Sequence, residues 1–349
     1  MSLTLYVDAD RYEAHLRTVV EKVPRIVPVT KGNGYGLSNA RLAMKAEKLG
    51  ADTLAVGTYD ELPQVQALFT RDLLVLTPWR PFGPAVERDA DPRVIHTVSR
   101  LEDLDDLLGS DPAARVVLER MTSMLRHGLS ARELRSAREV LARHPEARVE
   151  GVTLHLPLAR GSHLTEMHRL MTDVVAAGLD SRTVWVSHLE DDELAGLEAA
   201  YPDYAFRPRI GTRLWLGDRG ALRVRASVLD VHHVARGDVY GYRGRTAPRG
   251  GTVVVVTGGT AHGIGLAAPT GEGSFRARAT AVARGSLEAA GFVRSPYRVG
   301  GKQRLFAEPP HMQASMLFLP DDVPPPAVGD EVEVQVRFTA TTFDRTVVS

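Results

Sequence analysis

The sequence predicts an α/β protein in which an N-terminal (β/α)8 TIM-type barrel is followed by a C-terminal mostly-β domain. Two observations support this fold class. Strands alternate with helices from residue 25 to about 210, and from about Leu222 the chain changes to short β-branched runs separated by Gly and Pro. A chain of 349 residues with 44% hydrophobic content can bury two cores. We therefore place the barrel at residues 1–220 and the β domain at residues 221–349.

Eight short runs bounded by turn residues are expected to form the barrel strands. They are Arg25–Val29, Thr53–Gly57, Asp72–Leu76, Val94–Thr97, Arg115–Glu119, Val149–Leu154, Thr183–Ser187 and Tyr204–Phe206. Helical patterns lie between them, such as Ser38–Leu49 before Gly50, and Ser130–Arg143, which opens with the capping box Ser130-x-x-Glu133. In a barrel of this kind, chemistry gathers at the C-terminal ends of the strands.

Four β-branched runs predict the second domain: Val224–Val231, Gly251–Val256, His311–Leu319 and Glu331–Arg337. Within it, Thr257–Gly265 matches the Thr-Gly-x-x-x-Gly-x-Gly nucleotide loop of short-chain dehydrogenases. Such a loop must open a helix, and the Pro and Gly residues of segment 267–273 would break one at once. We therefore reject a dinucleotide site here.

Composition excludes several classes of partner. The chain has 43 basic and 43 acidic residues, which argues against nucleic acid or an anionic membrane as the main ligand. It has no cysteine, and hence no disulfide framework or thiolate metal site. The first residues lack a charged-then-apolar leader, and no apolar run is long enough to span a bilayer. We expect a cytoplasmic protein.

Lys31 ends the first predicted strand and precedes the turn Asn33–Gly36. A lysine there is either a surface residue that extends its amine into water or a desolvated amine that condenses with a carbonyl. The segment Lys-Gly-Asn-Gly-Tyr-Gly resembles the Lys-Ala-Asn-Ala-Tyr-Gly signature of alanine racemases and related fold-type III enzymes. In that family the lysine holds pyridoxal 5′-phosphate (PLP) as a Schiff base, and the resemblance implies this role for Lys31.

Three further segments around predicted strand ends resemble the same family. Thr122–Leu129 is similar to Thr-Gly-Met-x-Arg-x-Gly, whose arginine, here Arg126, contacts the PLP phenolic oxygen and the substrate. His155 ends a segment similar to one whose histidine packs against the cofactor ring. Arg207–Thr212 resembles the Arg-x-Gly-Ile element, whose arginine, here Arg209, faces the pyridine nitrogen. Each residue alone would be read as structural, but their order after strands favours a site.

An arginine at the pyridine nitrogen keeps that nitrogen unprotonated, which favours brief proton removal and return over transamination. For the cofactor phosphate, the resemblance points to Tyr35, Gly211 and Thr212, through a hydroxyl and backbone amides. Ser187, at the end of the seventh strand, is a further candidate, although its spacing to Arg209 is longer than in the family.

Glu119 stands seven residues before Arg126, where many alanine racemases carry a carbamylated lysine. A glutamate supplies the same negative charge without modification. We expect Glu119 to orient Arg126 directly. The alternative is a surface carboxylate, which is uncommon at a strand end inside a barrel.

A racemase also needs a second acid–base group on the opposite face of the substrate. In the family it is the tyrosine of a Gly-Tyr-Ala-Asp-Gly motif reaching in from the partner subunit, and in the matching segment Gly259–Gly263 it is replaced by Thr260. His262 is one candidate replacement. His311 is another, and with Met312 it belongs to a segment resembling the family's Met-Asp-Gln substrate loop. For both histidines, a hydrogen bond within a turn is an equally open reading.

The resemblance as a whole implies a PLP-dependent amino acid racemase that acts on a small amino acid as a homodimer with shared active sites. Lys31 would hold the cofactor and act as one acid–base group. The missing tyrosine keeps two alternatives open. One is a PLP-binding protein without racemase activity, serving cofactor homeostasis or regulation, and the other is a decarboxylase or aldolase of the same fold.

Overall fold

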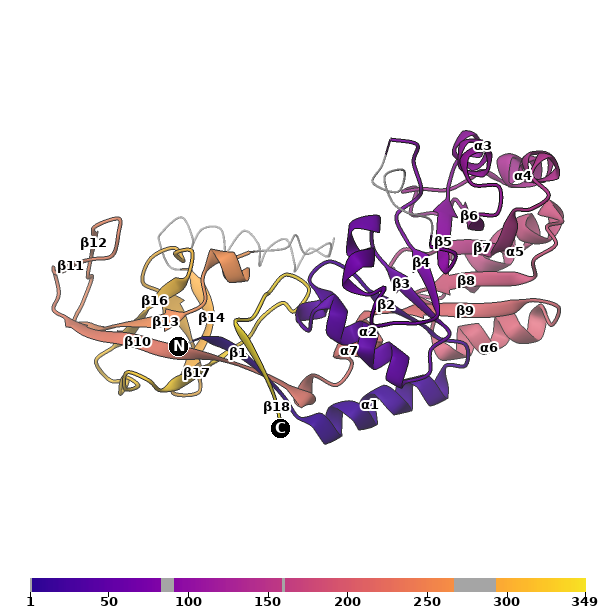
Figure 1. The fold of residues 1–349 in the computed structure, drawn as a ribbon. Helices are drawn as coiled ribbons and strands as arrows, with labels where there is room; N and C mark the ends of the chain where they lie inside the picture. Colours follow the sequence, from indigo (N-terminus) through magenta and orange to yellow (C-terminus); the bar gives the residue numbers. More distant parts are fainter. Residues whose placement is uncertain (1, 83–90, 159–160, 267–292) are drawn as a thin grey trace. The chain divides into compact units, whose positions relative to one another are not determined.

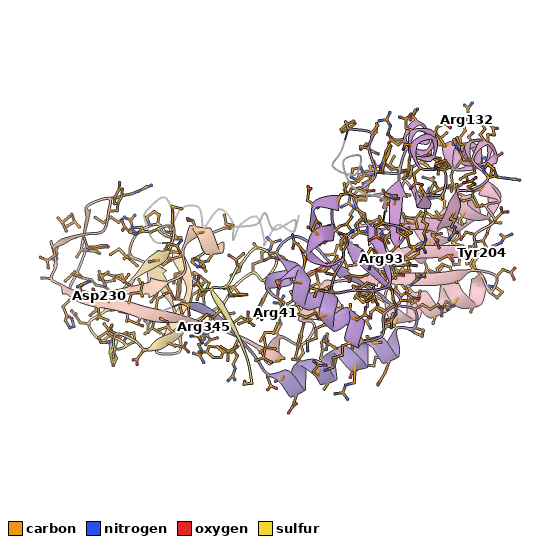
Figure 2. All side chains as sticks on the ribbon, viewed as in Figure 1. Arg41, Arg93, Arg132, Tyr204, Asp230 and Arg345 are labelled. Atoms are coloured by element: carbon orange, nitrogen blue, oxygen red, sulfur yellow. The ribbon has the colours of Figure 1, made fainter. Side chains whose placement is uncertain are left out.

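The computed structural model of the chain describes residues 2–82, 91–158, 161–266 and 293–349. The chain divides into two compact units, residues 14–217 and residues 1–13 together with 218–349. In Figure 2, Arg93 and Tyr204 mark the first unit, and Asp230 and Arg345 mark the second.

The first unit is built on a closed barrel of eight parallel strands in the order β2 to β9 (Figure 1), which confirms the predicted barrel. The strands are β2 Val27–Thr30, β3 Thr53–Val56, β4 Asp72–Val75, β5 Val94–Val98, β6 Arg115–Arg120, β7 Arg148–His155, β8 Thr183–Ser187 and β9 Ala205–Ile210. Each overlaps one predicted strand. The barrel closes where β9 pairs with β2, through Val27 opposite Arg209 and Pro28 opposite Ile210.

Helices follow most of the barrel strands, and α1 Ala9–Lys22 precedes the first of them. The others are α2 Asn39–Lys48, α3 Leu101–Ser110, α4 Ala131–Arg143, α5 Leu164–Ala177, α6 Asp191–Ala200 and α7 Thr212–Leu216, with the 3-10 turns η1 Gly34–Gly36 and η2 Tyr59–Gln64. The predicted capping box of α4 is present, because Ser130 and Glu133 exchange side-chain to backbone hydrogen bonds of 2.8 and 3.2 Å. After β3 there is only η2, which contains Pro63, and the described residues between β4 and β5 form no helix. Across the ranges given above, no helix has the length and apolar character required to cross a bilayer.

The barrel interior is filled by an apolar layer from alternate residues of its strands. Its members are buried to within a few per cent: Val27, Val29, Ala55, Leu74, Ile95, Val117 and Trp185. Burying each large side chain stabilises the fold by about 1.5–3 kcal/mol. This packed apolar layer lies beneath the C-terminal ends of the strands, where the polar residues of the candidate site lie.

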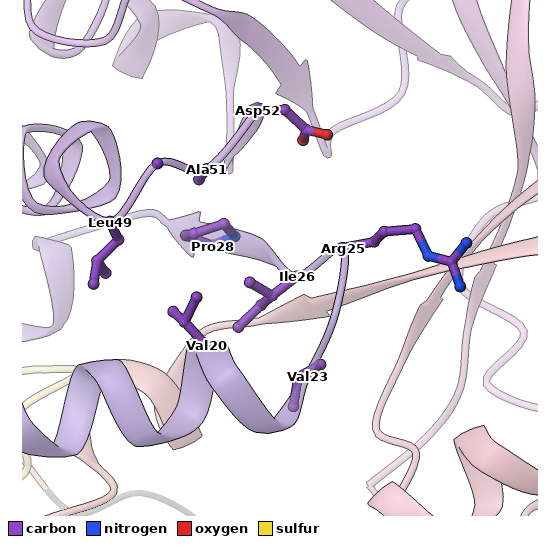
Figure 3. A pocket seen from close by; sticks show the side chains of 9 residues that line it. Val20, Val23, Arg25, Ile26, Pro28, Leu49, Ala51 and Asp52 are labelled. Carbon is purple, nitrogen blue, oxygen red and sulfur yellow. The ribbon is translucent and has the colours of Figure 1, made fainter.

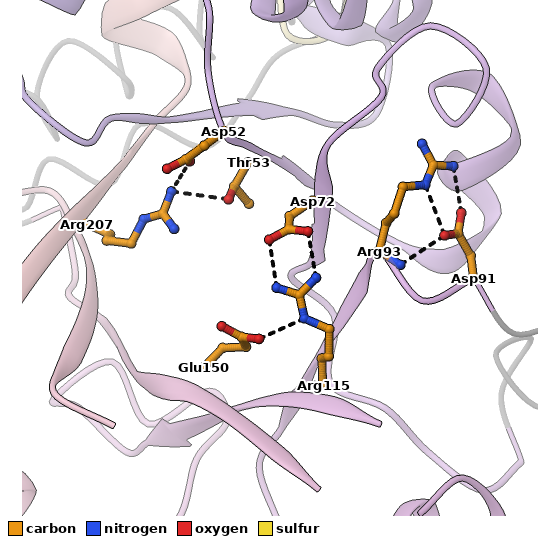
Figure 4. A network of polar contacts seen from close by, with 8 residues as sticks. All are labelled: Asp52, Thr53, Asp72, Asp91, Arg93, Arg115, Glu150 and Arg207. Atoms are coloured by element: carbon orange, nitrogen blue, oxygen red, sulfur yellow. Dashed lines mark hydrogen bonds and ion pairs between the residues drawn. The ribbon is translucent and has the colours of Figure 1, made fainter. Parts of the chain in front are cut away.

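A polar network joins the N-terminal ends of the strands (Figure 4). Arg115 donates two hydrogen bonds to Asp72, at 2.6 and 2.7 Å, and a third to Glu150 at 2.7 Å. Arg207 contacts Asp52 in the same way and stacks over an interior tryptophan. In barrel folds this end carries stability rather than chemistry. We therefore assign the network a structural role.

The second unit is an eight-stranded sheet in the order β13-β16-β15-β14-β17-β10-β1-β18, with a separate two-stranded ribbon. The strands of the sheet are β1 Leu3–Val7, β10 Leu222–Val234, β13 Gly251–Thr257, β14 Arg294–Val299, β15 Lys302–Phe306, β16 Ala314–Pro320, β17 Glu331–Val334 and β18 Arg345–Val348. The ribbon is β11 Val239–Tyr240 and β12 Arg245–Thr246. β1 pairs antiparallel with β10 and parallel with β18. Leu3–Val7, which lies within the range 1–220 predicted for the barrel, therefore belongs to this sheet.

β13 lies between β10 and β16 and is antiparallel to both. It leads into the three-residue turn η5, Thr260–His262. It is therefore not the parallel strand of a dinucleotide-binding βαβ unit, which supports our rejection of a dehydrogenase loop. The segment 267–273, on which the sequence argument also relied, lies outside the described residues.

Candidate active site

Lys31 follows β2 directly, at the C-terminal end of the barrel. The chain turns away from the strand through Gly32 and Tyr35, whose φ angles are positive. Asn39 fixes this turn, because its side-chain oxygen accepts a 2.5 Å hydrogen bond from Thr30 and its nitrogen donates to the Gly32 carbonyl at 3.0 Å. The site lysine is thus held between two anchored residues.

The amine of Lys31 has a pKa below its ordinary value of 10.5. Partial desolvation is the main cause, and the positive charges of Arg126 and Arg209 add to it. The carboxylate of Glu61 acts in the opposite direction. A lysine with a lowered pKa is more often neutral, and the neutral amine is the form that attacks a carbonyl.

Glu119 and Arg209 are buried charged groups whose fields both reach Arg126. Burial raises the pKa of Glu119, against the effect of both arginines, and it lowers the pKa of Arg209 to about 10. Arg209 donates to the Leu154 carbonyl at 3.3 Å, while its Nε and one oxygen of Glu119 have no hydrogen-bond partner. Within the described ranges no ion pair joins Glu119 to Arg126, so direct orientation of that arginine remains a prediction.

His155 ends β7 and its Nδ1 lies 2.8 Å from the hydroxyl of Ser187, at the end of β8. Burial and the neighbouring positive charges lower the pKa of His155 to about 3, so the ring is neutral at physiological pH. The ring of His188 lies 5.2 Å from it, on a backbone with φ of 63°. Ser187, expected as a phosphate candidate, is therefore hydrogen-bonded to His155 in this structure.

Tyr35, Gly211 and Thr212, the three predicted phosphate candidates, lie together in the structure. The hydroxyl of Tyr35 is hydrogen-bonded to Thr212, and burial raises the pKa of the phenol to about 12. A Cβ atom on Gly211 would lie 1.9 Å from that hydroxyl, so a larger residue at this position would displace the tyrosine ring. Thr212 begins α7, whose first backbone amides are not used within the helix.

Two residues near Lys31 were missed by the sequence analysis. Glu61 accepts hydrogen bonds from the backbone amides of Gly32 and Gly57, and the pattern Thr58-x-x-Glu61 carried a signal, because it is a capping box. His188 carried none, since one histidine after a strand has many ordinary roles.

In the β unit, the two segments that resemble family motifs are joined by backbone hydrogen bonds. The amide of Thr260 donates to the carbonyl of His311 at 2.8 Å, and the amide of Ala261 donates to that of Met312 at 3.0 Å. The side chains of Thr260 and Met312 are exposed. The position of the missing tyrosine and the candidate substrate loop therefore form one local surface.

The two histidines of this surface differ in their surroundings. His262 is buried, its Nδ1 accepts from the Gly259 amide at 3.2 Å, and its Nε2 lies 3.1 Å from Asp344. His311 is 44% exposed, and its Nε2 lies 2.7 Å from the buried carboxylate of Glu308. The ring nitrogens of His262 are thus both engaged in holding the turn, whereas His311 presents a ring to solvent.

A shallow cavity of about 270 Å³ opens beside the end of α1 (Figure 3). Apolar side chains such as Val20, Ile26 and Leu49 line it, with Arg25 and Asp52 also at its wall. It lies near the N-terminal ends of β2 and β3, at the other end of these strands from Lys31. It does not contribute to the candidate site.

Comparison with known proteins gives one consistent result. A family model described as "Alanine racemase, N-terminal domain" matches residues 7–188. The alanine racemase of Sorangium cellulosum (strain So ce56) is 27% identical over 268 residues, which is 69% of this chain and 69% of that protein. The alanine racemase of Geobacillus kaustophilus (strain HTA426) is 31% identical over 151 residues, 42% of this chain and 39% of that protein.

Solved structures agree at the level of the fold. The alanine racemase from Bartonella henselae with covalently bound pyridoxal phosphate has a TM-score of 0.73 and 18% identity, and the match covers 100% of both chains. The alanine racemase from E. faecalis has a TM-score of 0.69 and 20% identity, over 99% of this chain and 98% of that one.

Proposed function

The chain belongs to the alanine racemase family, and from that premise we propose that it is a PLP-dependent racemase-type enzyme that exchanges the α-proton of a small amino acid. One observation carries the proposal. The charges of Arg126 and Arg209 both act on the amine of Lys31, at the end of a TIM-type barrel where such folds place their chemistry.

The residues present fit this cofactor. PLP presents a carbonyl, an anionic phosphate and a pyridine nitrogen that accepts a hydrogen bond. Lys31 supplies an amine for the carbonyl, and the buried Nε–H of Arg209 is a donor without a partner among the described residues. The Tyr35 hydroxyl and the backbone amides of Gly211 and Thr212 would hold the phosphate.

When bound, PLP delocalises the charge that develops on the α-carbon. Arg209, facing the pyridine nitrogen, would limit that delocalisation, because a guanidinium with a pKa of about 10 is a cation at neutral pH that would donate a hydrogen bond to this nitrogen and leave it unprotonated. Lys31 would take and return the proton at Nζ on one face, helped by its lowered pKa. His155 stays neutral and would pack against the ring without adding charge.

For the second acid–base group, the geometry favours His311 over His262. His262 cannot leave its bonds to Gly259 and Asp344 without opening the turn. The Nε2–H of His311 donates to Glu308, which fixes the tautomer and leaves Nδ1 as the proton acceptor. We further propose that Met312, next to it, contacts the substrate, and that Arg126 holds the substrate side from the barrel.

The shared active site of a homodimer is part of this proposal. It is supported by the exposure of the surface formed by Thr260, His311 and Met312. A Lys31→Ala protein mixed with a His311→Gln protein should recover up to about a quarter of wild-type activity per site through hybrid dimers. Recovery no greater than the sum of the separate proteins would exclude sharing.

Spectroscopy and peptide mapping test the proposal. Purified protein with added PLP should develop a visible absorbance band, and borohydride reduction should leave a pyridoxyl label on Lys31. A Lys31→Arg protein keeps the charge but should lose both signals, whereas Lys302→Arg, an exposed control, should keep both. No label on Lys31 in the wild-type protein would overturn the assignment.

Thr260, in place of a catalytic tyrosine, is the observation that favours a second candidate, a PLP-binding protein without turnover. Chiral chromatography of a panel of amino acids after incubation separates the two. Inversion of any of them supports racemisation. A labelled Lys31 with no inversion supports the binding protein, and release of carbon dioxide or an aldehyde identifies a decarboxylase or aldolase.

A further inference from the structure

Glu61 connects the ends of two neighbouring barrel strands. One oxygen of its carboxylate accepts a 2.6 Å hydrogen bond from the amide of Gly32, the residue after Lys31. The other accepts a 2.7 Å hydrogen bond from the amide of Gly57, directly after β3. β2 and β3 pair in parallel, so a single side chain ties the mouths of both strands together.

These bonds are not explained by helix capping. In a capping box the glutamate at the third helical position needs to reach only the amide of the capping residue, here Thr58. Glu61 does so at 3.3 Å, which is its longest contact of the three. The two shorter bonds go to the ends of the strands, so the strand ends are the stronger determinant of where the carboxylate sits.

Gly57, Lys31 and Glu61 are also packed closely against one another. A Cβ atom placed on Gly57 would lie 2.8 Å from the Cβ of Lys31 and 2.9 Å from Oε2 of Glu61. The lysine stem and the carboxylate therefore occupy the space above the glycine together. The carboxylate of Glu61 also acts on the Lys31 amine, against Arg126 and Arg209.

We propose that Glu61 is a positioning residue for Lys31: its hydrogen bonds to Gly32 and Gly57 fix where the lysine leaves the barrel. Its negative charge also favours the ammonium form of the amine, against the two arginines. This inference rests on the proposed function for its catalytic meaning. The position and protonation of the amine can nevertheless be measured without the cofactor.

The test is the pH dependence of Lys31 acylation by an amine-selective reagent, followed on the Lys31 peptide by mass spectrometry in the absence of PLP. Glu61→Gln keeps the length of the side chain and removes its charge. Its reaction midpoint should move to lower pH, because the ammonium form loses its nearby anion. Glu47→Gln is the matched control, since Glu47 also accepts a backbone amide and a hydroxyl, both from Thr70, and its midpoint should stay unchanged.

A second variant tests the position of the carboxylate while keeping its charge, and it can be used if the Glu61→Gln protein fails to fold. Glu61→Asp keeps the charge but is one methylene too short to span Gly32 and Gly57. Borohydride trapping of PLP on Lys31 should slow by about tenfold or more. An unshifted midpoint in Glu61→Gln, or wild-type trapping in Glu61→Asp, would overturn the proposal. If wild-type protein traps no PLP, the proposed function fails while the acylation midpoints still report on Glu61.

Discussion

Gly57→Ala is the sharpest steric test of the site. The added methyl would lie 2.8 Å from the Cβ of Lys31, about 0.6 Å closer than the 3.4 Å at which ordinary van der Waals contact begins. Gly57 itself cannot retreat, because its amide is bonded to Glu61 and its carbonyl accepts from both the amide and the hydroxyl of Thr77. Its φ is not in the left-handed region, so alanine adds no backbone strain there. The displacement must therefore fall on the lysine or the carboxylate.

We expect this overpacking to cost about 1–3 kcal/mol of stability. A shift of the lysine by half an ångström or more should also slow PLP trapping, and any racemisation, by about tenfold or more. Urea unfolding measures the first effect and borohydride trapping the second. Gly196→Ala is the matched control, since nothing lies within 4 Å of its Cβ and alanine inside α6 should stabilise the protein by about 0.5–1 kcal/mol. If Gly57→Ala behaves like this control in both assays, the packing described here is wrong.

Three further predictions follow. Gly211→Ala should weaken PLP binding, measured by absorbance titration, because its Cβ would lie 1.9 Å from the Tyr35 hydroxyl, and Tyr35→Phe in the same chain should recover less than full affinity. Arg115→Met should cost about 1–3 kcal/mol in urea unfolding yet leave PLP trapping unchanged, because its network lies at the far end of the strands. The free energy of unfolding should fall between pH 6.5 and 5. Histidines of the unfolded chain bind protons near pH 6.5, whereas in the folded protein His96 and His155, with pKa values of about 4 and 3, stay unprotonated over this range. His96→Gln should make this loss of stability smaller.

The barrel was predictable because its strands are buried on both faces. Such strands appear in sequence as short apolar runs between turn residues, and all eight overlap the predicted ranges. β9 was predicted too short, since Arg207-Pro208-Arg209 does not resemble a buried strand. The structure shows why it is one: Arg207 is paired with Asp52, and Arg209 reaches the Leu154 carbonyl. A buried strand that carries charged side chains with partners lacks the apolar run by which such strands are recognised in a sequence.

The β unit was harder because its strands are assembled from distant parts of the chain. β1 pairs with β10 and β18, more than 200 residues away, and nothing local in Leu3–Val7 indicates that partner. β14 and β15 form an antiparallel pair with little of the apolar–polar alternation typical of a strand, because a buried position of β14 is occupied by Ser295 and β15 opens with three consecutive polar residues, Lys302 to Arg304. By contrast, each barrel strand and the motif at its C-terminal end are contiguous in the chain. The sequence therefore indicated the candidate site residues of the barrel more readily than those of the β unit.

The same difference between local and distant contacts explains why the sequence alone did not identify one candidate for the second acid–base group. A tyrosine replaced by threonine cannot be compensated by a neighbour in the chain, because neighbouring side chains leave the turn in other directions, as buried His262 shows. For the proposed racemase activity, the compensating group would have to come from another segment that meets the turn. His311 does so, because its carbonyl accepts the Thr260 amide while its ring stays exposed and is oriented by Glu308. If His311→Gln abolishes inversion of an amino acid and leaves PLP trapping on Lys31 intact, the acid–base function has moved between segments and the cofactor site has stayed in place.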